Sequence, residues 1–133
     1  MTEQWTRWEP ISGLAAKHYI ESMFDGIDGF KIVLSGADDE TKRVQIVFKD
    51  SVLAYRSTYE GFKVNIFSDL SKRYGTNFYA QWSFFKVNNS NYLQWVLEQA
   101  GTTDSLSCMH FCVFSSEAIV DIIATYEPIV ELI

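Results

Sequence analysis

The chain is poor in cysteine and proline and lacks a long apolar run. It has two cysteines, Cys108 and Cys112, and two prolines among 133 residues, so no disulfide framework is needed and a reducing cytoplasm is the expected compartment. Residues 1–10 mix tryptophans with charges and lack the apolar core of a signal peptide. The apolar stretch at 118–124 is interrupted by Asp121 and is far shorter than the roughly 18 residues that cross a bilayer. We therefore expect a protein that is neither exported nor embedded in a membrane.

Basic side chains are also scarce. Seventeen acidic residues against eleven basic ones give a formal net charge of −6, and no basic cluster is longer than Lys42-Arg43 or Lys72-Arg73. Binding to nucleic acid usually requires a basic surface, so direct binding of nucleic acid is not expected. A basic protein would be attracted by the same charge. Moderate negative charge also serves solubility alone, and that interpretation stays open.

What the chain does have is enough apolar material for one folded unit. Hydrophobic residues make up 47% and aromatic residues 16% of its 133 residues, which is sufficient for a continuous core. No internal repeat or low-complexity linker divides it. We expect a single α+β domain over residues 1–133, built on a mostly antiparallel β-sheet with one or two packed helices.

Alternating and β-branched residues predict the strands. The Asp/Gly turn signals at 25–29 indicate a hairpin. The segment before them, 14–24, fits a helix or a strand, and its second half favours a strand. The other predicted strands are 30–34, 44–48, 52–56, 62–66, 108–114, 119–125 and 129–133.

Two helices are expected. Ser68 is a suitable N-cap for a short helix that Gly75 would end. The best amphipathic pattern contains Tyr92 and Trp95, starts after an N-cap at Asn89 or Ser90 and ends at Gly101. A loop is predicted at 102–104.

The sharpest local pattern is Cys108-Met109-His110-Phe111-Cys112, which would place three potential zinc ligands on one face of a strand. Same-face side chains on one strand are nearly 7 Å apart, which strains a tetrahedral site. The only other histidine, His18, is distant in sequence. A nucleophilic Cys112 would need a base that His110 on the same strand cannot supply locally. We therefore expect core packing, with no metal, no cofactor, no catalytic residue and no enzymatic activity.

Asp121 is the one charge inside an apolar run. It is predicted either to face solvent at an edge or to pair with a donor such as His110 or Arg56. Two alternative functions stay open. One is an enzyme built around His110, Asp121 and Arg56. The other is a pocket for a small molecule or peptide, lined by Phe78, Tyr79, Trp82 and Tyr92.

Several stretches resemble a family of small bacterial proteins associated with polymorphic toxin loci. They are Phe48-Lys49-Asp50-Ser51-Val52-Leu53-Ala54-Tyr55-Arg56, Glu60-Gly61, Val87-Asn88-Asn89-Ser90-Asn91-Tyr92-Leu93-Gln94-Trp95, His110-Phe111, Asp121-Ile122-Ile123 and Glu127-Pro128. Where this chain has Phe111, the family more often has tyrosine. The resemblance implies an immunity protein, a cytoplasmic inhibitor that binds a cognate toxin domain, commonly a nuclease, and blocks its active site or its access to substrate.

Two groups of residues are the predicted contributors to such binding. Asp38, Asp39 and Glu40 form a polar loop between predicted strands, where charges are solvated and would steer a basic toxin domain. Trp5 and Trp8 lie among charges near a terminus and are candidates for surface anchors.

Overall fold

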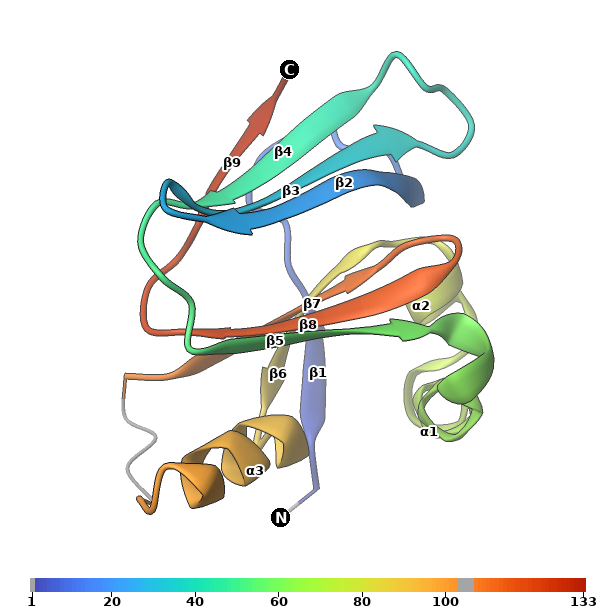
Figure 1. Ribbon diagram of the computed structural model, residues 1–133. Coiled ribbons are helices and arrows are strands. Elements are labelled where there is room, and N and C mark those ends of the chain that lie inside the picture. Colours follow the sequence, from blue (N-terminus) through green and yellow to red (C-terminus); the bar gives the residue numbers. More distant parts are fainter. Residues whose placement is uncertain (1, 103–106) are drawn as a thin grey trace.

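The structure is a computed structural model that describes residues 2–102 and 107–133. It contains two antiparallel sheets stacked face to face, with three α-helices on the outer face of one of them (Figure 1). The predicted α+β class is therefore confirmed. No helix in this described part is both long and apolar enough to span a bilayer.

The four-stranded sheet has the order β2-β3-β4-β9. Its strands are β2 (His18–Gly26), β3 (Gly29–Gly36), β4 (Arg43–Phe48) and β9 (Ile129–Leu132). The predicted hairpin joins β2 to β3, with Gly26 opposite Gly29. Gly29 has φ +104°, and a Cβ at this position would lie 2.1 Å from the carbonyl oxygen of Phe48. Only glycine fits a turn that approaches the neighbouring backbone so closely.

The five-stranded sheet has the order β1-β6-β7-β8-β5. Its strands are β1 (Gln4–Arg7), β5 (Ala54–Tyr59), β6 (Phe84–Asn88), β7 (Met109–Phe114) and β8 (Ala118–Ala124). Side chains alternate between its faces. Phe111 and Val113 of β7 belong to the core between the sheets, whereas Cys112 and Phe114 belong to the core under the helices.

Three α-helices cover the outer face of the five-stranded sheet. They are α1 (Val64–Tyr74), which follows a 3-10 turn η1 (Glu60–Phe62), α2 (Asn77–Ala80) and α3 (Asn91–Gln99). Leu70 of α1 packs on Cys112 and its neighbours, and Leu93 of α3 packs with Ile123. The predicted N-cap at Ser90 is confirmed, because its Oγ accepts a hydrogen bond from the Leu93 backbone N–H at 2.9 Å.

One predicted element is wrong, and three elements were not foreseen. The predicted strand at 62–66 is the end of η1 and the start of α1, because Ile66 and Leu70 lie four residues apart and pack together on the sheet. The helix therefore begins before Ser68, which is not its cap, although Gly75 ends it as predicted.

Strands β1 and β6 and helix α2 had no predicted counterpart. Residues 103 and 104 of the predicted loop lie outside the described residues.

The prediction that Trp5 and Trp8 are surface anchors is also wrong. Strand β1 pairs with β6, which lies about 80 positions further along the chain, and this pairing fixes both indoles within the protein. Trp5 is 6% exposed and packs edge-on against Phe85 and Phe114 under the helices. Trp8 is 7% exposed and packs on Phe84 and Phe111 between the sheets. Neither indole projects from the surface as an anchor for a partner protein.

His18, at the start of β2, is buried as well. The Ser83 hydroxyl donates to the Ala16 carbonyl, so the His18 Nδ1–H donates to Ser83 Oγ at 3.0 Å. Burial, and secondly the charge of Lys17, lower the pKa of His18 from 6.5 to about 4. The folded state therefore favours the neutral imidazole.

This histidine should make the protein sensitive to mild acid. Because the folded pKa lies below the unfolded one, the stabilisation is complete above pH 6.5 and is lost as the pH falls towards 4. The expected loss by pH 4 is about 3 kcal/mol. Urea unfolding between pH 4 and 8 should show this slope in the wild type and a flatter profile in His18→Asn. Equal slopes would mean that other groups cause the acid sensitivity.

Candidate functional site

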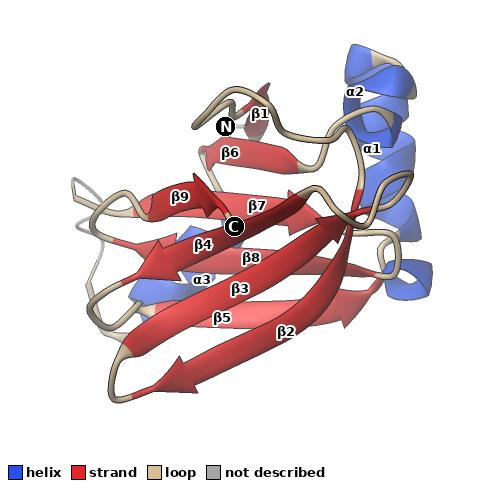
Figure 2. Cartoon of the chain, turned by 90° about the horizontal axis from the view of Figure 1, so that it is seen from above, coloured by secondary structure: helices blue, strands red, loops and turns tan. Residues whose placement is uncertain are grey.

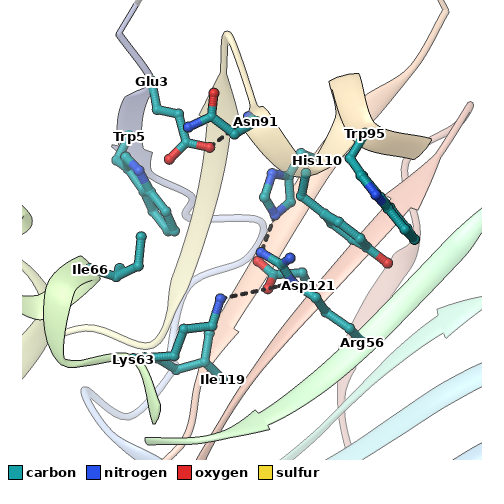
Figure 3. A pocket seen from close by; sticks show the side chains of 11 residues that line it. Glu3, Trp5, Arg56, Lys63, Ile66, Asn91, Trp95, His110, Ile119 and Asp121 are labelled. Carbon is teal, nitrogen blue, oxygen red and sulfur yellow. Dashed lines mark hydrogen bonds and ion pairs between the residues drawn. The ribbon is translucent and has the colours of Figure 1, made fainter. Parts of the chain in front are cut away.

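The main polar cluster on the helix-covered face is centred on Asp121, whose side chain is 2% exposed. One carboxylate oxygen, Oδ1, lies 2.7 Å from His110 Nε2, and the other, Oδ2, accepts from Arg56 Nε at 2.8 Å (Figure 3). Lys63 Nζ lies 3.6 Å from Oδ2. The predicted pairing of Asp121 with His110 or Arg56 is therefore confirmed with both at once.

Strand register explains this convergence. In the five-stranded sheet, Asp121 of β8 stands opposite Arg56 of β5 on one side and Cys112 of β7 on the other. His110 lies two residues before Cys112 and so faces the same way. Lys63 joins them from the N-cap position of α1.

The cluster holds Asp121 as an anion. Burial alone would raise the pKa of Asp121, but the hydrogen bonds and charges of His110 and Arg56 outweigh it and hold this pKa well below its usual range. The carboxylate thus stays ionised in the folded protein and fixes the cations around it.

Both ring nitrogens of His110 make hydrogen bonds, Nε2 with Asp121 and Nδ1 with Ser90. Its Nδ1 lies 2.7 Å from Ser90 Oγ, which also accepts from the Leu93 N–H. Nε2–H donates to the Asp121 carboxylate, and Nδ1 shares a hydrogen bond with the Ser90 hydroxyl. The residue types and their contacts match those of a catalytic triad, but Ser90 is buried and its Oγ also caps α3. A hydroxyl that is buried and occupied as a helix cap is poorly placed to attack a substrate.

A metal fits this cluster poorly. Ligand atoms of His110, Cys112 and Asp121 lie within 4.8 Å of one another, a set that replaces Cys108 of the sequence pattern with the aspartate. Arg56 and Lys63 already neutralise that carboxylate and would repel a cation. Burial, and then the Asp121 charge, raise the pKa of the Cys112 thiol well above its ordinary value, which disfavours the thiolate that a metal or a nucleophilic reaction needs. These observations favour core packing for Cys112.

A pocket opens beside the cluster, between α1 and α3 (Figure 3). Its volume is about 190 Å³. The Arg56 guanidinium lies over the Tyr92 ring at 4.0 Å from its centroid, and the Trp95 ring runs nearly parallel to Tyr92, at 16° and 6.3 Å. Aromatic rings and two cations thus meet in one cavity.

The structure does not bring the predicted site residues together. Asp38, Asp39 and Glu40 are exposed in the loop between β3 and β4, in the sheet that carries no helices. Hydrogen bonds from the Thr41 hydroxyl and then its backbone N–H lower the pKa of Asp39. Trp5 forms one wall of the pocket and Trp8 lies between the sheets.

The predicted ring-lined pocket does not form either. Phe78, Tyr79 and Trp82 pack against the core under α1 and α2, whereas Tyr92 lies on α3 and lines the pocket beside Asp121.

Sequence reasoning missed Glu3, Lys63 and Trp95, which line the pocket. Although Trp95 belongs to the amphipathic helix pattern, nothing in the sequence marks the three as one site, because they come from three separate segments. Ser90 carried a signal only as a helix cap, and its contact with His110 depends on how α3 sits on the sheet.

Comparisons with protein-family models, with curated proteins and with solved structures found no match for this chain. The resemblance to immunity proteins therefore stays a prediction. The functional argument has to come from the residues and their arrangement.

Proposed function

We propose that this protein is a binding protein that neutralises a cognate bacterial toxin domain by covering its active site or its access to substrate. One observation carries the proposal, namely a row of exposed apolar side chains along one side of the sandwich. Under this proposal the protein acts in the bacterial cytoplasm, where its thiols stay reduced, and it needs no catalytic residue of its own.

The row follows two strands that run along the same side of the molecule, β2 and β5 (Figures 1 and 2). Each is the outermost strand at that side of its sheet. We call the row the apolar edge; it consists of Phe24, Ile27, Leu53, Tyr55, Tyr59 and Phe62, all exposed. Ile27 is 100% exposed and Phe62 is 83% exposed. Open edge strands with large apolar side chains are normally avoided or covered, which supports a partner at this surface.

Charge along the apolar edge favours a basic partner. The segments 24–28 and 49–62 carry four exposed carboxylates, those of Asp25, Asp28, Asp50 and Glu60, against two exposed basic residues, Lys49 and Arg56. A basic nuclease cleft would be steered towards such a surface. Aromatic side chains then supply most of the contact energy in interfaces of this kind.

The test begins with a pull-down of the tagged protein from its native host at low and high salt, followed by expression of the captured partner alone. We expect that the partner stops growth and that co-expression of the wild-type protein restores it. The double variant Ile27→Asp/Phe62→Asp should fold normally, bind at least tenfold more weakly and fail to protect, because both side chains are exposed. Leu132→Ser, an exposed aliphatic change on β9, is the matched control and should protect fully.

Two results would overturn the proposal, and a separate variant tests the acidic loop. A captured partner that is harmless when expressed alone, or an apolar-edge variant that protects like the wild type, would overturn the proposal. Replacing Asp38, Asp39 and Glu40 together by lysine tests whether their loop takes part. Slower association with a weaker salt dependence would support a steering role, and unchanged kinetics would remove the loop from the interface.

A further inference from the structure

The pocket between α1 and α3 contains two cations, Arg56 and Lys63, whose hydrogen-bond donors are only partly occupied within the described residues. Arg56 donates to Asp121 through its Nε alone, and within the described residues its two Nη groups make no hydrogen bond. The Lys63 side chain is only 13% exposed, yet its Nζ stands 3.6 Å from Asp121, beyond hydrogen-bond distance. These donors line a cavity, and a buried carboxylate holds them in place. Such donors are suited to binding an oxyanion.

We propose that this pocket binds a small aromatic carboxylate. The carboxylate would accept hydrogen bonds from Arg56 and Lys63, and the ring would lie among Trp5, Tyr92 and Trp95 (Figure 3). The pocket contains none of the six apolar side chains of the apolar edge, although Arg56 lies at both surfaces, and it does not require the proposed toxin partner.

The net charge of the pocket side chains favours a monoanion over a dianion. Asp121 offsets one of the two cations, and Glu3, on the wall opposite Lys63 in Figure 3, adds a second negative charge. The Glu3 carboxylate accepts from the Asn91 backbone N–H at the start of α3, which keeps it in place. The pocket is therefore close to neutral, and it suits a monoanion better than a phosphate dianion.

The volume of the pocket and the side chains that line it indicate which group the carboxylate would carry. The volume of about 190 Å³ is slightly larger than the roughly 150 Å³ of a protein cavity that holds benzene. One six-membered ring with a carboxyl group fits this space. The Trp95 ring, 55% accessible, offers a flat surface against which such a ring packs, and Tyr92, 7% exposed, lines the pocket beside it.

Benzoate is the probe for this site, and calorimetric titration of the full chain is the first measurement. We expect benzoate to bind with a dissociation constant below about 1 mM. Benzamide, which has the same shape without the charge, should bind at least tenfold more weakly. Lys63→Met should weaken benzoate binding at least tenfold, while Lys72→Met, an exposed lysine of α1 outside the pocket, should leave it unchanged.

A second measurement needs no variant in the pocket. In ¹H–¹⁵N spectra of the wild type, benzoate should shift the indole N–H signals of Trp5 and Trp95 and leave those of Trp8 and Trp82 in place, since only the first two line the pocket. Three results would overturn the inference: no binding of benzoate, equal binding of benzamide, or tighter binding of inorganic phosphate than of benzoate.

Discussion

Asp121→Ala should lower the free energy of unfolding by about 3–5 kcal/mol at neutral pH, the usual cost of removing one partner from a buried ion pair. The carboxylate accepts from His110 and Arg56 and neutralises Lys63, and it is only 2% exposed. Its loss would leave the Lys63 ammonium without its counter-charge and the buried His110 N–H without its acceptor. Urea unfolding followed by tryptophan fluorescence measures this change.

Two comparisons make this prediction specific. Asp69→Ala removes an exposed carboxylate that pairs with Arg73 on α1, and it should cost less than about 0.5 kcal/mol. Asp121→Asn keeps the side-chain shape and removes the charge. Because the folded pKa of Asp121 is depressed, its stabilisation is complete above the ordinary aspartate pKa of about 4 and is lost below it. The Asn variant should lack this part of the acid sensitivity.

A cost below about 1 kcal/mol for Asp121→Ala would contradict this account of the cluster. It would mean that Arg56 and Lys63 reach solvent once the carboxylate is gone, with no strain on the fold. In that case Asp121 could not be what holds the two cations at the pocket.

Trp8→Ala should lower the free energy of unfolding by a similar amount, about 3–5 kcal/mol. The indole lies between the two sheets, with its ring centroid 5.0 Å from that of Phe111 and 6.3 Å from that of Phe84. Truncation leaves a cavity between sheets that are locked by backbone hydrogen bonds and relax only in part. Chemical denaturation of the purified variant is the measurement.

Trp95→Ala is the matched control, since this indole is 55% exposed. It should cost less than about 1 kcal/mol, because an exposed side chain loses little burial on truncation. If the two variants proved equally stable, Trp8 would not be a core residue and the interpretation of it as a surface anchor would return.

Much of the fold was predictable because it is encoded locally. The hairpin between β2 and β3 follows from the Asp/Gly turn, and strands β4, β7 and β8 follow from alternating or β-branched runs. The cap at Ser90 was also visible, because a capping side chain bonds a backbone N–H only three residues away. Each of these signals lies within a few residues of the element that it specifies.

Other features escaped prediction for one of two reasons. Either the same residues fit both a strand and a helix, or the element forms only by pairing with a distant segment. Phe62, Val64 and Ile66 alternate like a strand, but packing of Ile66 and Leu70 on the sheet favours the helix. Strand β1 shows no period of its own and exists through its pairing with β6.

The candidate site divides in the same way. The sequence by itself determined that Asp121 sits in an apolar run, and it left two alternatives, exposure at an edge or pairing with a donor such as His110 or Arg56. Only the tertiary structure decided that Lys63, Ser90 and the pocket walls join them, and that Trp5 and Trp8 are buried. The physical reason is that hydrogen-bond need is a property of one side chain, whereas burial and proximity depend on strands and helices that are far apart along the chain.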